Sequence, residues 1–311
     1  MVFIDKSTQH STEAKQRLED WKASFICGAT TNNDGSINND YQGFTLEDFY
    51  NKAELGELTG TKIWKIFSTV PLIKAQLRSD LSIEQDHICC YCGQQLVIDK
   101  TRIEHFLSKA KAFASRLFNY DNLLLSCDGT PEGQFVDRLQ FLQGRLETIE
   151  EFLLRMSITL ETIEEYNIGI VQNYNDGKIN TTKDIYLGRN HCDPYKGYIE
   201  QKLNTDISIV NPTTHKLCWQ YFKVNNQGFI SINETLDEET KELASKSIYA
   251  LNLNAAELQK KRKNAWIEFE KLWINEMSSQ FDITTYRDIQ LEIKQPFCFV
   301  NYHFIQQLME Q

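Results

Sequence analysis

The stretch that decides the fold runs from His87 to Cys127 and reads HICCYCGQQLVIDKTRIEHFLSKAKAFASRLFNYDNLLLSC. It opens with a Cys-x-x-Cys pair, Cys89 and Cys92, and ends on a further cysteine, and a fourth cysteine, Cys192, follows in the downstream segment HCDPYKG. A Cys-x-x-Cys pair brings two thiolates onto one turn, and two more cysteines complete the tetrahedral sulfur set that suits structural Zn²⁺. The sequence therefore predicts one structural zinc ion bound by Cys89, Cys92, Cys127 and Cys192.

The chain contains eight cysteines, a number that would also suit the disulfide framework of a secreted protein. However, its N-terminus lacks the basic start and apolar centre of a signal peptide, and four of the cysteines have metal-type spacing. Cys90 could replace Cys89 as a ligand, but only Cys89 leaves two residues before Cys92. The remaining cysteines are predicted to be small buried apolar residues: Cys27, Cys90, Cys218 and Cys298.

The segment VIDKTRIEHF, between the second and third of these ligands, has the apolar and β-branched character of a strand. Because successive side chains of a strand point to opposite faces, Glu104 and His105 are expected to face opposite sides. One of the two can then bind a metal ion while the other faces a reactant.

Four motifs of this chain recur together in one family. They are Cys90-Tyr91-Cys92 behind Cys89, Ile103-Glu104-His105, Asn122-Leu123-Leu124-Leu125-Ser126-Cys127, and His191-Cys192 with Lys196-Gly197. In these motifs the chain resembles the HNH endonucleases, and it is most similar to the HNH nuclease subunit of Septu-type and retron-linked anti-phage defence systems. The resemblance implies a ββα-metal nuclease core that carries the four-cysteine zinc site.

Site residues follow from the same resemblance. It makes His105 the general base that activates a water molecule, Glu104 the acidic ligand of a catalytic Mg²⁺ or Mn²⁺, and Asn122 the residue that orients His105 through the loop between them. The last catalytic ligand falls on Asp193, where the family usually has Asn or His, and a carboxylate is still a hard oxygen ligand suited to Mg²⁺. His191 is the competing candidate for that position.

For function, the resemblance implies a metal-dependent endonuclease that hydrolyses phosphodiester bonds of nucleic acid, with DNA as the expected substrate. RNA, including tRNA, is the alternative substrate for an effector of the same defence systems. A zinc ribbon that binds without catalysis is the third interpretation, although it needs neither the Glu-His pair nor the Asn-Leu motif. The implied partners are an ABC or SMC-like ATPase subunit and, in retron-linked systems, a reverse transcriptase and a non-coding RNA.

Net charge bears on how such a protein would hold nucleic acid. The formal charge is −10 and the isoelectric point is near 5.2, which argues against a free-standing DNA binder, because such binders gain affinity by neutralising phosphates. Either a partner supplies the contacts or a local basic patch does. The candidate patch, which could equally be a solvated surface, consists of Lys100, Arg102, Lys109, Lys111 and Arg116.

The chain has 311 residues, 41% of them hydrophobic and 24% charged, which is an ordinary globular composition. We expect an α+β, mostly helical protein with a helical N-terminal region at 1–85, the nuclease core at 86–200 and a C-terminal hairpin and helical region at 201–311. No run approaches the roughly 18 apolar residues of a membrane span, so a cytoplasmic location without membrane contact is expected.

A helical insertion at 130–188 separates the third and fourth cysteines. Its apolar residues alternate in steps of four and three, as in a heptad repeat: Phe135, Leu139, Leu142, Leu146, Ile149, Leu153, Met156, Leu160 and Ile163. An apolar stripe of this length needs a cover, which could be the same chain, an identical chain or another protein.

Local signals predict several further elements. Thr45 and Asp48 have capping-box spacing, the segment Asn225–Gly228 separates two short strands of a hairpin, and Asp237 begins a helix. A later helix carries the basic run Lys260–Lys263, which could contact phosphates or form a solvated turn before an amphipathic core helix.

Overall fold

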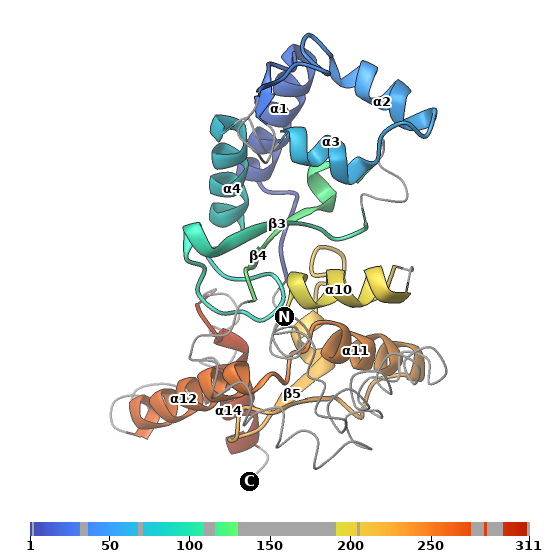
Figure 1. Ribbon diagram of the computed structural model, residues 1–311. Coiled ribbons are helices and arrows are strands. Elements are labelled where there is room, and N and C mark those ends of the chain that lie inside the picture. Colours follow the sequence, from blue (N-terminus) through green and yellow to red (C-terminus); the bar gives the residue numbers. More distant parts are fainter. Residues whose placement is uncertain are drawn as a thin grey trace, which may run out of the picture. The chain divides into compact units, whose positions relative to one another are not determined.

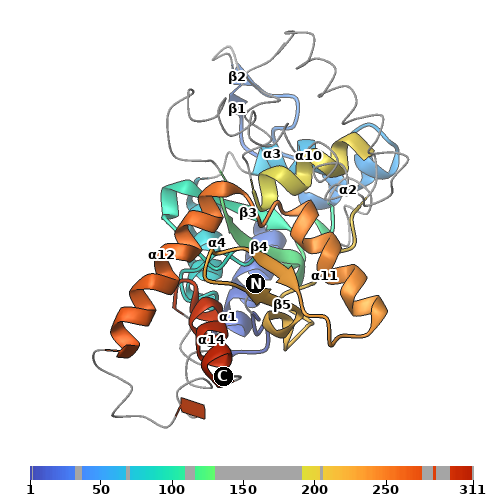
Figure 2. The ribbon, with the colours of Figure 1, turned by 90° about the horizontal axis from the view of Figure 1, so that it is seen from below.

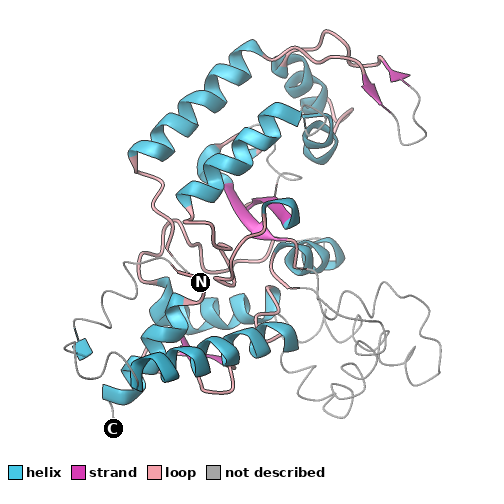
Figure 3. Ribbon diagram, turned by 90° about the vertical axis from the view of Figure 1, so that its left-hand side faces the viewer, coloured by secondary structure: helices cyan, strands magenta, loops and turns pink. Residues whose placement is uncertain are grey.

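The computed structural model describes residues 1, 3–31, 37–67, 71–108, 116–129, 191–203, 206–274, 283–284 and 295–309 (Figure 1). The described part is α+β and about half helical, as Figure 3 shows by colour, and its strands form two-stranded sheets. The predicted insertion at 130–188, with its heptad stripe from Phe135 to Ile163, lies outside the described residues. None of the described helices is long and apolar enough to cross a membrane.

The chain divides into two compact units, which we name by their chemical groups. The cysteine unit comprises Met1–Phe3, Ile88–Arg102 and Ser126–Gln311, and the His105 unit comprises Ile4–His87 and Ile103–Leu125. The range predicted as one nuclease core, 86–200, therefore contributes to both units. The N-terminal helical region predicted at 1–85 belongs almost entirely to the His105 unit.

The His105 unit is mainly helical. Its elements are α1 (Gln9–Ser24), β1 (Thr30–Thr31), β2 (Ile37–Asn38), α2 (Leu46–Glu54), α3 (Gly60–Phe67), α4 (Pro71–Glu84) and the short helix η2 (Tyr120–Asn122). The predicted capping box at the start of α2 is confirmed, because Asp48 N donates to Thr45 Oγ1 and Thr45 N donates to Asp48 Oδ2. A cluster of aromatic rings fills the interior, with Trp21 4.5 Å from Phe67 and 5.6 Å from Phe118 between ring centroids.

A buried lysine connects the start of the chain to this interior. Lys6 forms an ion pair with Glu84 at the end of α4, and its Nζ also donates to the carbonyl of Leu123 at 2.9 Å. The same ammonium group lies 4.3 Å from the ring centroid of Tyr120. Because a buried charge is tolerated only when it is paired and hydrogen-bonded, these contacts fix the strand that begins at Leu123 against α4.

A hairpin links the two units in sequence. Its strands, β3 (Thr101–His105) and β4 (Leu123–Cys127), pair with each other, and the short helix η1 (Ile98–Lys100) precedes β3. Phe106 N donates to Asn122 O at one end and Asp128 N donates to Lys100 O at the other, so the strands run antiparallel. The predicted strand over VIDKTRIEHF is thus confirmed only for its second half.

The cysteine unit contains the remaining described elements. These are α10 (Asp193–Leu203), η3 (Cys218–Tyr221), β5 (Phe222–Val224), β6 (Ile230–Ile232), α11 (Glu238–Ala250), α12 (Ala256–Leu272) and α14 (Cys298–Met309). The predicted hairpin is confirmed as the antiparallel pair β5 and β6, and Asp237 caps α11 as predicted. Helices α12 and α14 lie side by side, with Phe304 5.3 Å from Trp266 and 5.5 Å from Phe269 between ring centroids (Figure 2).

Candidate metal centre and candidate active site

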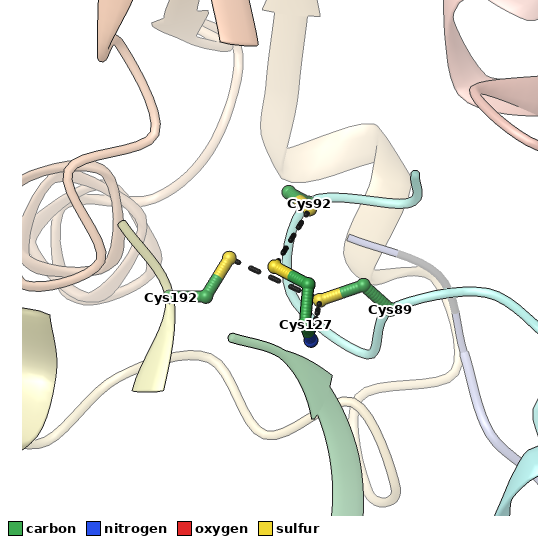
Figure 4. A group of neighbouring side chains, drawn as sticks. All are labelled: Cys89, Cys92, Cys127 and Cys192. Carbon is green, nitrogen blue, oxygen red and sulfur yellow. Dashed lines mark hydrogen bonds between the residues drawn. The ribbon is translucent and has the colours of Figure 1, made fainter. Parts of the chain in front are cut away.

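The four predicted cysteine ligands come together in the cysteine unit. Their sulfur atoms all lie within 4.8 Å of one another and point toward a common centre (Figure 4). The Sγ atoms of Cys89 and Cys192 are 3.9 Å apart, as are those of Cys92 and Cys127. All four side chains are buried, and the group includes Cys89 and not its neighbour Cys90, as the two-residue gap predicts. The cysteines left over are buried as well.

The sulfur spacing fits a metal ion. A zinc ion bonds to thiolate sulfur at about 2.3 Å, so the edges of a ZnS₄ tetrahedron measure about 3.8 Å. The two distances of 3.9 Å match these edges and far exceed the roughly 2.05 Å of a disulfide bond. Four buried cysteines at this spacing can therefore hold a metal such as zinc.

Backbone geometry explains how each half of the centre is held. In the first half, Cys89 N donates to Gln94 O and Gly93 N donates to Cys89 O, which closes the loop that carries the Cys-x-x-Cys pair. Gly93 has a φ of 71°, a left-handed conformation that glycine adopts without strain. Phe297 N donates to Gly93 O at 2.8 Å, so the segment before α14 supports the same loop.

The second half depends on a close approach between two chain segments. Cys127 ends β4, and the segment that carries Cys192 runs past the following residues, where His191 N donates to Gly129 O at 3.2 Å. A Cβ atom on Gly129 would lie 2.0 Å from the His191 carbonyl oxygen, so only glycine permits this approach. Cys192 itself has a φ of 59°, which is uncommon for a residue with a side chain, and its N–H donates to Leu251 O.

The thiols of the centre change one another's pKa values. Burial acts to raise the pKa of Cys89, but hydrogen bonds from Cys127, Cys192 and the other neighbouring thiols outweigh it and hold that pKa well below its usual value. Burial and the same hydrogen bonds raise the pKa of Cys192 well above its usual value. Binding a metal to these thiols requires the release of protons.

His191 lies at this centre. Its Nδ1 is 3.2 Å from Cys192 Sγ and 3.7 Å from Cys127 Sγ, and the side chain is buried. Burial lowers the pKa of His191 to about 4, so the ring is neutral at physiological pH. The imidazole, predicted as a candidate ligand of a catalytic metal, is thus in contact with the cysteine sulfurs.

The predicted general base, His105, ends β3 in the His105 unit and is 4% exposed. Its Nε2 lies 2.9 Å from the carbonyl oxygen of Leu117, and the ring stands edge-on to Trp64 at 4.4 Å between centroids. Because a carbonyl oxygen can only accept, Nε2 carries the proton in the neutral ring, and Nδ1 is the atom with a lone pair. The imidazole is therefore held in the tautomer in which Nδ1 can act as a base.

Asn122 holds both ends of the loop that follows His105. Its Oδ1 accepts from Leu107 N at 2.8 Å, and its Nδ2 donates to the carbonyls of Leu107 and Arg116, each at 3.0 Å. The carbonyl that orients His105 belongs to Leu117, which directly follows Arg116. Asn122 thus lies where its predicted role, orienting His105 through the loop, requires it; the role itself stays a prediction.

The two predicted acidic ligands belong to different units. Glu104, in the His105 unit, is 4% exposed, so His105 and Glu104 are both buried. Asp193 is half-buried and opens α10 in the cysteine unit, directly after Cys192. Of the basic patch, Lys100 and Arg102 are exposed, Arg116 is half-buried, and Lys109 and Lys111 lie outside the described residues.

Sequence reasoning missed that a cation of the C-terminal basic run is buried. Arg262, in α12, is fully buried, although the basic run that contains it was expected to contact phosphates or solvent. Helix spacing could have predicted this burial. Arg262 follows Leu258 by four residues and precedes Trp266 by four, and both of these apolar residues are buried. Residues four apart share a helix face, so Arg262 lies on the face that α12 buries.

No protein-family model matches the chain, and no curated protein matches it in sequence. The function therefore has to be inferred from the arrangement of these residues.

Proposed function

We propose that this protein is a metal-dependent endonuclease of the HNH type that hydrolyses phosphodiester bonds of DNA, with the four cysteines binding a structural zinc ion. The observation that carries the proposal is the hairpin of β3 and β4. Its first strand ends on His105 in a defined tautomer, Asn122 clamps the loop that follows, and its second strand ends on the metal-centre residue Cys127. A zinc ribbon that only binds needs none of the contacts around His105.

The helix α10 completes the proposed ββα arrangement. It is the next described element after β4 and begins directly after Cys192, whose sulfur belongs to the metal centre. Binding a metal to Cys127 and Cys192 would fix the start of this helix to the end of β4. Asp193, its first residue, is then presented by an anchored helix terminus.

The proposed chemistry assigns the proton of the attacking water to His105. His105 accepts a proton from the attacking water through Nδ1, because Nε2 is already committed to Leu117 O. A neutral imidazole has a suitable basicity for this step near pH 7. Asn122 acts indirectly, since it fixes the loop that supplies the carbonyl for Nε2.

Two carboxylates are each proposed, on the resemblance to HNH nucleases, as a ligand of a catalytic metal ion. Glu104 and Asp193 offer hard oxygen ligands, the donor type that Mg²⁺ and Mn²⁺ prefer. When bound, such an ion stabilises the charge that develops on the phosphate and on the leaving 3′ oxygen. His191 is the weaker candidate for this site, because its Nδ1 already contacts the sulfurs of Cys192 and Cys127.

Comparing two single variants tests this choice. Asp193→Ala should lower the cleavage rate by roughly 100-fold or more with normal zinc content, because it removes a ligand of the catalytic ion. His191→Ala should instead weaken zinc binding, and its cleavage rate should fall only in proportion to the loss of zinc. Cleavage rates measured against Mg²⁺ concentration, together with zinc analysis, distinguish the two. Normal cleavage by Asp193→Ala would assign the ligand elsewhere.

The substrate and the biological setting rest on other support. The resemblance to HNH nucleases favours DNA as the substrate. The acidic net charge of −10 favours a subunit that binds nucleic acid with the help of a partner. We propose that this partner is an ATPase of the ABC or SMC-like type. We place the protein in an anti-phage defence system on the resemblance alone. Supercoiled plasmid and tRNA, incubated in parallel with the protein and Mg²⁺ or Mn²⁺, separate the DNA and RNA alternatives. If neither the plasmid nor the tRNA is cleaved, the proposal is rejected.

A further inference from the structure

Arg262 is a buried cation whose described hydrogen bonds all go to neutral groups. Its Nε donates to Gly228 O and its Nη2 to Leu253 O, each at 2.7 Å, and Nη2 also lies 3.4 Å from Asn254 Oδ1. Its Nη1 is buried and has no hydrogen-bond partner among the described residues. A guanidinium that is fully removed from water is costly unless a negative charge compensates it.

The negative charges that would act on Arg262 are those of Cys92 and Cys192 once they are deprotonated, as metal binding requires. Burial lowers the pKa of Arg262 to about 9, and the charges of Cys92 and Cys192 oppose that change. Since the pKa stays above physiological pH, the guanidinium remains charged. Arg262 makes no hydrogen bond to a sulfur among the described residues, so this interaction acts through space and depends on charge, not on a specific contact.

A divalent metal bound by the four cysteines would leave a net negative charge in a buried site. Four thiolates around one divalent ion carry a net charge of −2, and the four cysteines are buried, at exposures of 0%, 1%, 3% and 0% for Cys89, Cys92, Cys127 and Cys192. In a medium of low dielectric constant an uncompensated charge of this size is unfavourable, whereas a fixed cation nearby is strongly favourable.

The fold holds Arg262 in place from the backbone. Gly228 has a φ of 74°, and a Cβ atom there would lie 2.1 Å from Gln259 O, so the turn between β5 and β6 rests directly on α12. That close approach brings the Gly228 carbonyl to Arg262 Nε. One residue earlier on α12, Lys261 donates to Gln94 Oε1 at 3.2 Å, which ties the same helical turn to the Cys-x-x-Cys loop.

We propose that Arg262 is the fixed counter-charge of the four-cysteine centre and that it strengthens the binding of a divalent metal there. A side chain of the C-terminal region thereby contributes to metal binding, although the cysteine motifs alone do not indicate this contribution. Arg262 is a positioning residue in this sense, since it acts on the thiolates and does not ligate the metal. The inference rests on the metal-binding part of the proposed function and is independent of cleavage.

Zinc affinity, measured by competition with a chromogenic chelator, tests the counter-charge. Arg262→Gln removes the charge but keeps an amide donor for the Gly228 carbonyl, and Arg262→Lys keeps the charge. We expect Arg262→Gln to bind zinc at least about tenfold more weakly than wild type, and Arg262→Lys to recover most of that loss. Lys260→Gln, an exposed neighbour on the same helix, should bind zinc as wild type does.

A second control separates charge from packing. Asn254 bonds to both the N–H and the carbonyl of Ile230, each at 2.8 Å, so Asn254→Ala loosens the same hairpin without removing a charge. If Asn254→Ala weakens zinc binding as much as Arg262→Gln does, or if Arg262→Lys fails to recover it, the counter-charge role is rejected. Should Arg262→Gln not fold, Arg262→Met, whose side chain has a similar length and no charge, replaces it in the same comparison. A wild-type chain that binds no zinc would overturn both the metal centre and this inference.

Discussion

Replacing His105 with alanine should abolish nucleic-acid cleavage while leaving the fold and the zinc content intact. A general base contributes roughly 10²- to 10⁴-fold to a rate, and a purified His105→Ala protein should lose activity on this scale. The fold should survive the loss of this single ring, whose contacts include a hydrogen bond to Leu117 O and an edge-on contact with Trp64. Initial rates of plasmid nicking, near-UV circular dichroism and zinc analysis measure the three properties on one preparation.

A matched control is available in the same unit. His87 is exposed and has a φ of 60°, so asparagine, which tolerates that conformation, replaces it with little strain. His87→Asn should cleave at the wild-type rate, since we assign it no role. If His105→Ala cleaves as fast as His87→Asn, His105 is not the base and the proposed active site is wrong.

The second large effect concerns the metal centre. Cys127→Ser should lose about one zinc ion per chain and much of the folded signal of the cysteine unit, because structural zinc contributes its binding free energy to folding. Cys127 is the ligand that ends β4, so its loss also releases the segment around His191 and Cys192. Elemental analysis and thermal melting provide the measurements.

Cys218→Ser is the control for this experiment. Cys218 belongs to the same unit and is 0% exposed, but it lies outside the group of four sulfurs. Its replacement should lower stability modestly, since a buried hydroxyl lacks the apolar character of a thiol, and should leave zinc bound. Full zinc retention by Cys127→Ser, or equal zinc loss by both variants, would contradict the assignment of the ligands.

Much of the metal centre could be predicted from sequence because zinc ligands obey short spacing rules. The gap of two residues selected Cys89 over Cys90, and the structure brings Cys89 together with Cys92, Cys127 and Cys192. The turn at Asn225–Gly228 and the cap at Asp237 were equally local, and both are confirmed. Local signals of this kind depend on backbone geometry over a few residues and need no knowledge of tertiary contacts.

Other features were missed, one because of a local helical turn and others because they depend on packing between distant segments. The strand before His105 starts at Thr101 and not at Val97, because Lys100 N donates to Val97 O and forms a helical turn there. The prediction for Arg262 considered its charge and not the helix face on which it lies. Leu258 and Trp266, four residues before and after it, are buried, and so is Arg262. His191 was the competing candidate for the last catalytic ligand; its ring contacts Cys192 Sγ, and its role stays a prediction.

The central proposal is that this chain hydrolyses phosphodiester bonds with a divalent metal ion and with His105 as the base. The most direct measurement is cleavage of supercoiled plasmid by the wild-type protein after brief EDTA treatment that leaves the buried zinc in place, with and without added Mg²⁺ or Mn²⁺. We predict no cleavage after EDTA, recovery on addition of either ion, and products with 5′-phosphate and 3′-hydroxyl ends. Cleavage that persists without a divalent ion, or products with a 3′-phosphate, would contradict the account.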